Sequence, residues 1–189
     1  MDIELNTLLV ALMFVTILSM GIGNILGSLA DILNHATSSR RDRLHIGWIV
    51  LVLLTHFNLF WNTKAILDNS DWKFGGFLLA IAGPVLLFFS TSVLLTTPEG
   101  KDEEDLRHFY RRLGRPFFLL FALVQGWILF TAFALEGRFI ALDVVNASLL
   151  VLALYLSSFA GERGHVVGLA LAWALALLSL VLRWLAVFG

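Results

Sequence analysis

The sequence contains no cysteine, only 3 prolines in 189 residues, and few charges, since Asp, Glu, Lys and Arg make up 14% of the chain. The absence of cysteine excludes disulfides, thiolate metal ligands, iron–sulfur ligation and cysteine nucleophiles. Soluble domains carry about 25% charged and about 45–50% apolar residues, whereas 59% of this chain is hydrophobic. The composition therefore excludes an ordinary soluble domain and predicts a membrane protein.

The chain also lacks the common motifs of soluble enzymes. It has no P-loop, no GxSxG nucleophile elbow, no HExxH helix and no dinucleotide-binding fingerprint. No basic domain is present that would host a nucleic acid. We therefore expect no catalytic residues, no metal site and no nucleic-acid partner, and the balance of these features is against an enzyme.

Long apolar runs are what the sequence does contain. A run of 18 or more apolar residues with few charges is typical of a transmembrane helix, which needs about 20 residues to cross a bilayer. We predict an all-α integral membrane protein, a single domain over residues 1–189 with six transmembrane helices. The expected spans are residues 5–34, 45–67, 74–96, 116–136, 139–160 and 165–188. The first run follows an acidic start and is too long for a signal peptide, so we expect it to be retained.

The basic residues predict the orientation of these spans. Lys and Arg concentrate in the first, third and fifth loops, and loops of this kind stay in the cytoplasm. Both termini are therefore expected outside the cytoplasm. In this orientation an aromatic belt would place tryptophans near both membrane interfaces. Trp48 would lie near the cytoplasmic interface, and Trp61, Trp72 and Trp184 would lie near the outer interface.

The third loop is the one sizeable extramembrane segment. Acidic residues follow Thr97-Pro98-Glu99, and Leu106, Phe109, Tyr110 and Leu113 then recur at helical spacing between arginines. This pattern predicts a short amphipathic helix over residues 102–113 on the cytoplasmic leaflet. It could bind a protein partner, or it could be a plain connector.

The first span carries a polar stripe beside two glycines. The stripe recurs at i, i+4, i+7 and i+11 and comprises Asn24, Ser28, Asp31 and His35. A charge at bilayer depth costs about 2.5–3.5 kcal/mol, so Asp31 either faces a wet vestibule or lies at headgroup depth. Gly23 and Gly27 form a GxxxG pair that would allow another helix to approach closely. We expect a homo-oligomer.

The second span places His56 close to two asparagines. Asn58 and Asn62 share a face with Thr55, and His56 lies about 100° around the helix. A histidine at this depth could relay protons, ligate haem iron or hydrogen-bond a neighbouring helix. All three readings remain open from sequence.

The fifth span carries Asp143 and Asn146, one turn apart on one face. Asp31 and Asp143 lie toward opposite sides of the bilayer, so they could form the two mouths of a polar route. Gln125 and Thr131 of the fourth span could line the same route, and interhelical hydrogen bonds explain these two residues equally well. The candidate path residues are Asn24, Asp31, His56, Asn58, Asn62, Asp143 and Asn146. This route requires the first, second and fifth helices to adjoin.

The main functional hypothesis is a small channel or carrier for a cation or proton, with no cofactor. One alternative is an electron-transfer subunit that holds haem or quinone at His56. The other is a non-catalytic scaffold or assembly protein, which would use Gly23, Gly27 and the 102–113 helix to bind partners. The sequence identifies no substrate.

Several short motifs resemble those of known proteins. They are Trp48, then Thr55-His56-Phe57-Asn58-Leu59-Phe60-Trp61, then Asp105-Leu106-Arg107-His108-Phe109-Tyr110, and finally Arg115-Pro116-Phe117-Phe118. Together they resemble a group of uncharacterised small bacterial six-helix inner-membrane proteins over residues 5–125. The resemblance implies a location in the bacterial inner membrane and implies no activity or site residue.

Overall fold

The computed structural model describes residues 5–34, 40–61, 73–96, 114–136, 140–158 and 162–188. These residues form only α-helices: α1 (Leu5–Asn34), α2 (Arg40–Trp61), α4 (Phe74–Leu95), α6 (Gly114–Glu136), α7 (Ala141–Ser158) and α8 (Glu162–Phe188). All 6 contain a segment long and apolar enough to cross a membrane. The predicted fold of six apolar helices is confirmed, and it indicates a multi-pass membrane protein.

The helix boundaries differ from the hydropathy pattern in one instructive place. Helix α2 begins at Arg40 rather than at His45, because Arg and Leu are good helix formers and hydropathy marks only the apolar part of a helix. The expected amphipathic helix over residues 102–113 lies outside the described residues.

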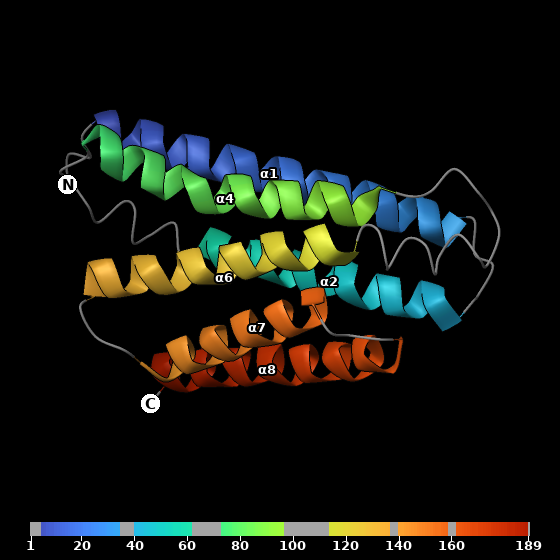
Figure 1. Cartoon of the computed structure of the whole chain (residues 1–189). Coiled ribbons are helices and arrows are strands. Elements are labelled where there is room, and N and C mark those ends of the chain that lie inside the picture. The colour runs from blue at the N-terminus through green and yellow to red at the C-terminus, as the bar shows by residue number, and fades with distance from the viewer. Residues whose placement is uncertain are drawn as a thin grey trace.

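The helices run up and down through the bundle in alternating directions. Helices α1 and α4 lie side by side along one flank, α7 and α8 form an antiparallel pair on the other, and α2 and α6 lie between them (Figure 1). Helix α1 begins and α8 ends at the same end of the bundle. An even number of crossings produces this arrangement.

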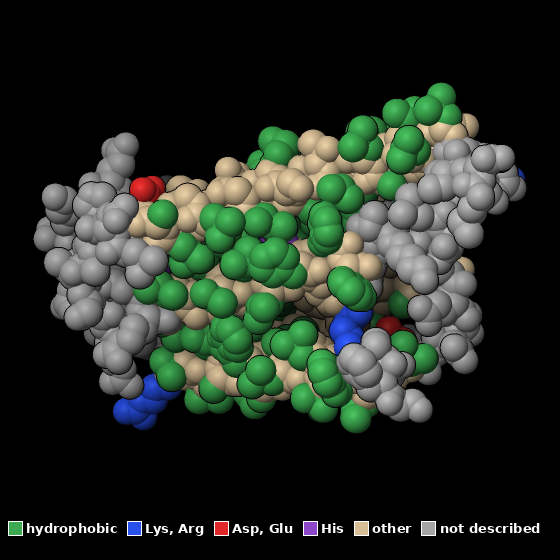
Figure 2. All heavy atoms as spheres, turned by 180° about the vertical axis from the view of Figure 1, so that it is seen from behind, with side chains coloured by type: hydrophobic (Ala, Val, Ile, Leu, Met, Phe, Trp, Pro, Cys, Tyr) green, Lys and Arg blue, Asp and Glu red, His purple; other side chains and the backbone are tan. Residues whose placement is uncertain are grey.

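The outer surface of the bundle is strongly apolar. Large hydrophobic side chains such as Leu12 on α1 and Val181 on α8 are more than half exposed, and they cover most of the face in Figure 2. Helix α8 is the most exposed, with 17% of its apolar window buried, against 33–39% for the other helices. Hydrocarbon chains would cover this surface without cost, because they are as apolar as leucine.

Tryptophans divide between this surface and the core. Trp61 and Trp184 are exposed near helix ends, as an interfacial belt requires. Trp48 instead is 1% exposed and lies inside the bundle. Its ring packs on α6 rather than facing outward, and its position near the cytoplasmic interface stays a prediction.

Four of the helix contacts set a glycine against a large side chain. A Cβ added at these glycines would overlap the neighbouring side chain, and the pairs are Gly21 with His56, Gly47 with Leu169, Gly83 with Trp127, and Gly168 with Leu156. Helices in lipid gain little from the hydrophobic effect and are held by close packing, which small residues allow. The pairs join α1 to α2, α2 to α8, α4 to α6, and α7 to α8.

The contact between α4 and α6 also carries a hydrogen bond. Pro84 has no N–H and leaves the carbonyl of Ala80 without its helical donor. In the same stretch, the Trp127 indole N–H donates to the Leu79 carbonyl at 2.7 Å. The Trp127 ring occupies the space beside Gly83, so one side chain fixes both the spacing and the register of these helices.

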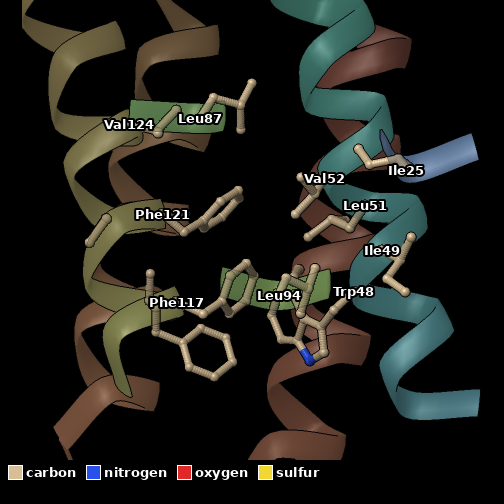
Figure 3. Packing of buried hydrophobic residues seen from close by; sticks show 14 of the residues in the cluster. Ile25, Trp48, Ile49, Leu51, Val52, Leu87, Leu94, Phe117, Phe121 and Val124 are labelled. Carbon is tan, nitrogen blue, oxygen red and sulfur yellow. The ribbon is translucent and has the colours of Figure 1, made fainter. Parts of the chain in front are cut away.

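Helices α2 and α6 are held apart by aromatic rings. The aromatic cluster consists of Trp48 on α2 with Phe117, Phe118 and Phe121 on α6. Trp48 meets Phe117 edge-on at 5.9 Å and Phe118 at 5.0 Å between ring centroids. Figure 3 shows Trp48 and Leu51 of α2 pointing toward Phe117 and Phe121 of α6. The two backbones are not among the pairs that approach closely, because rings of this size fill the space between them.

We predict that Gly83→Ala destabilises the protein while Gly75→Ala does not. The added Cβ at position 83 would overlap the Trp127 ring, whereas nothing lies within 4 Å of the corresponding position at Gly75. Overpacking of this kind costs about 1–3 kcal/mol. Thermal unfolding of both variants in the same detergent measures the difference, and equal midpoints would show that Gly83 is not required for the α4–α6 contact.

Candidate functional site

A cavity of about 50 Å³ lies where α2, α6, α7 and α8 meet. It extends from the buried side chains of Phe121 and Gln125 to Leu180, which is exposed at the surface. The rear face of the bundle is hollowed between rows of hydrophobic side chains (Figure 2). The polar residues that line the cavity are Thr55, Asn58, Gln125, Asn146 and Ser179.

The cavity exists because α2 and α6 are spaced by the aromatic cluster. In the half of the bundle where both helices begin, Trp48 and Phe118 fill the gap between them. Farther along, the facing residues are Thr55 and Gln125, and their smaller side chains leave space. The aromatic cluster therefore lies at one end of the cavity, and Phe121 belongs to both.

Two hydroxyl groups in the lining already use their hydrogens. Thr55 Oγ1 donates to the Leu51 carbonyl at 3.0 Å, and Ser179 Oγ donates to the Ala176 carbonyl at 2.7 Å. Such bonds to the preceding turn are common for Ser and Thr in membrane helices. Each hydroxyl oxygen retains lone pairs, so both residues present acceptors to the cavity.

Gln125 is the deepest polar residue of the site. It is 2% exposed and lies near the middle of the apolar segment Gly114–Ala134. Within the described parts of the chain, its Oε1 has no hydrogen-bond partner. A buried acceptor without a donor costs about 1–3 kcal/mol, so this oxygen requires something that the described residues do not supply.

Asn58 and Asn146 complete the polar lining from opposite sides. Both are half-buried, Asn58 on α2 and Asn146 on α7. Each amide offers one oxygen acceptor and one NH₂ donor and can turn either toward a ligand. The structure thus brings together two of the asparagines that the sequence singles out, on helices far apart in the chain.

His56 lies on the other side of α2, against α1. Its Nδ1 donates to the Val52 carbonyl at 2.9 Å, so the proton of the neutral ring is on Nδ1. Its Nε2 is fully buried, faces Gly21, and has no hydrogen-bond partner among the described residues. The imidazole therefore acts as a packing element of the α1–α2 contact and does not line the cavity.

Asp143 stabilises the start of α7. Its Oδ2 accepts a hydrogen bond from the backbone N–H of Ile140 at 2.8 Å, and the Ile140 carbonyl accepts one from the Asp143 N–H at 3.0 Å. This reciprocal pair closes the first turn in the manner of a capping box. The carboxylate also lies in the first turn, where the helix dipole favours negative charge.

Helix α1 contributes nothing to the lining of the cavity. Asn24 and Asp31 lie on its exposed face, as do Gly23 and Gly27, around which the described structure leaves open space. Asn62 lies outside the described residues. The expected enclosure by the first, second and fifth helices is not the arrangement observed, because α1 packs on α4 and α2, and α7 packs on α6 and α8.

Sequence reasoning gave Gln125 too little weight and missed Ser179. Gln125 is the only glutamine of the chain and stands in a long apolar run, which is a usable signal for a buried polar role. Ser179 interrupts the leucine-rich sixth span. Its role depends on α8 lying against α7 and α2, and periodicity within α8 contains no information on that arrangement.

Comparison with protein-family models, with curated proteins and with solved structures finds no match to this chain.

We predict that Asp143→Ala lowers stability by about 1 kcal/mol through the loss of its capping hydrogen bond. Asp143→Asn keeps an oxygen acceptor for the Ile140 N–H and should lose less. Chemical or thermal unfolding of the two variants in one detergent distinguishes them. Equal, undiminished stability of both would show that the cap contributes nothing to α7.

Proposed function

We propose that this protein is a small channel or carrier that moves a cation or proton across a membrane through the cavity between α2, α6, α7 and α8. The observation that carries the proposal is the convergence of five neutral polar side chains on one hollow within an apolar bundle. Polar groups inside membrane spans are costly, and in membrane proteins they mark substrate and ion pathways.

The position of the site supports transport over a purely structural role. Substrate sites of small transporters lie near the bilayer midplane between helices, and Gln125 is near the middle of its span. From Gln125 the cavity continues toward the end of the bundle where α2 finishes, since Thr55 and Asn58 lie in the last turns of that helix. With the orientation predicted from the basic loops, this end is the outer half of the membrane.

The opposite half is closed by the aromatic cluster. Phe121 lines the cavity and stacks on Phe117 at 6.0 Å, and Phe118 stacks on His165 of α8 at 5.4 Å. We infer that these rings form the barrier on the inner side, and that a transport cycle or an open state requires them to separate. Hydrophobic constrictions of this kind serve as gates in channels.

The redox alternative at His56 fits the structure poorly. The free nitrogen, Nε2, is turned toward the α1 backbone at Gly21, where even one added carbon would overlap the ring. A haem iron at this atom would need α1 to move away from α2. We therefore prefer the transport proposal and route no chemistry through a cofactor.

The proposed setting is the bacterial inner membrane, with both termini outside the cytoplasm. The basic first and third loops support the orientation, and the motif resemblance supports the membrane. We keep the homo-oligomer as part of the proposal, because Gly23 and Gly27 occupy an exposed face of α1 that would allow a second copy to approach.

We predict that Asn58→Leu and Asn146→Leu each reduce cation or proton flux about tenfold in proteoliposomes. Leaving a bound species without one hydrogen bond at the site costs about 1–3 kcal/mol. Asn24→Leu is the matched control, because Asn24 lies on the exposed face of α1 away from the cavity. Flux that falls equally in all three variants, or in none, would contradict the proposed path.

We predict that Phe121→Ala raises flux and lowers stability. Truncating a core phenylalanine costs about 3–5 kcal/mol, and here it also joins the cavity to the space held by the aromatic cluster. Phe130→Ala, on the exposed face of the same helix, should change neither. If the Phe121→Ala variant conducts no more than the wild-type protein, the aromatic cluster is not the barrier.

A further inference from the structure

We infer that the cavity binds a monovalent cation stripped of most of its water, and that Gln125 determines this specificity. The inference rests on the proposed function for its place in transport, but the binding itself is measurable without transport. It starts from Gln125, whose side chain lines the cavity and whose Oε1 is enclosed and lacks a donor within the described chain. A half-turn of the carboxamide brings this oxygen to the cavity side.

The lining offers neutral oxygens from several side chains. The hydroxyl hydrogens of Thr55 and Ser179 are held by their own helices, so these two oxygens are left with acceptor lone pairs. The carboxamides of Gln125, Asn58 and Asn146 can each turn an oxygen toward the cavity. A set of neutral oxygens from four helices can replace the hydration shell of a cation, as carbonyl oxygens do in potassium-selective filters.

Charge and hydration restrict the cation to a single charge. The described residues that line the cavity include no Asp, Glu, Lys or Arg, so none of them compensates the charge of a bound ion. The cost of desolvating an ion in a low-dielectric interior is steep and grows with the square of its charge. Mg²⁺ also dehydrates reluctantly and holds several of its waters when bound, so neutral oxygens alone are a poor replacement for its hydration shell.

Anions are disfavoured by the same lining. The hydroxyl hydrogens of Thr55 and Ser179 are already engaged, so an anion would bind through the NH₂ groups of Gln125 and the two asparagines alone, beside hydroxyl oxygens that present only lone pairs. Potassium, sodium and ammonium are therefore the ions to test.

Binding is tested by thermal unfolding of the full chain in detergent. The probes are KCl, NaCl and NH₄Cl, with MgCl₂ and CaCl₂ as divalent probes and N-methyl-D-glucamine chloride as the ionic-strength control. At about a hundredfold above its Kd, a ligand that binds the folded state should raise the unfolding midpoint by roughly 5 °C or more. We expect this rise with at least one of the three monovalent cations and not with the divalent ions or the control.

Two substitutions at Gln125 separate a binding role from a packing role. Gln125→Leu removes the oxygen and should weaken the monovalent effect about tenfold in apparent Kd. Gln125→Glu keeps the shape and adds a charge, so it should strengthen cation binding and admit Ca²⁺, which a packing residue would not do. Ser90→Ala is the matched control, because Ser90 is equally buried with an unpaired Oγ on α4 but does not line the cavity.

Asn146→Ala provides a second test if Gln125 variants fail to fold, since Asn146 is only half-buried. It should also weaken the monovalent effect. Equal stabilisation by all salts, or a cation effect that survives both Gln125→Leu and Asn146→Ala, would overturn the inference. Flux that depends on Asn58 without any cation-dependent stabilisation would overturn the inference and leave the proposed function standing. Cation-dependent stabilisation without flux would leave the inference standing and overturn the proposed function.

Discussion

The spacing between helices is the constraint on which the rest of this structure depends. Where a glycine faces a large side chain, as Gly83 faces Trp127, two helices approach closely and the contact is dry. Where aromatic rings face each other, as Trp48 faces Phe118, the helices are held apart. In lipid these packing distances replace the hydrophobic effect as the main determinant of helix arrangement.

Helix α2 illustrates how this spacing separates two polar environments. On one side, His56 fits against Gly21 and bonds only to its own helix. On another side, Thr55 and Asn58 face the cavity opposite Gln125. The first polar group is enclosed by close packing, and the others are left beside empty space. One helix therefore carries both a buried packing histidine and part of a binding site.

The residues of the site differ in how far sequence could assign them. Asn58 and Asn146 stood out as polar groups within apolar spans, and the structure brings both to one cavity. Asp143 stood out from sequence in the same way, yet its carboxylate accepts a hydrogen bond from the Ile140 N–H and caps α7. A cap three residues into a helix and a carboxylate at the mouth of a path share the same hydropathy pattern. Only the backbone geometry at the helix start distinguishes them.

The sequence by itself determined the number of helices, their apolar character and the polar residues inside them, because these follow from local composition and helical periodicity. Tertiary structure alone decided which polar residues meet. It turned Asn24 and Asp31 outward, turned His56 toward α1, and placed Gln125 and Ser179 beside the two asparagines. The reason is physical: in lipid both faces of an apolar helix are acceptable on the outside, so hydropathy does not specify which face turns inward. Packing between helices makes that choice, and at four of the helix contacts it sets a glycine against a large side chain.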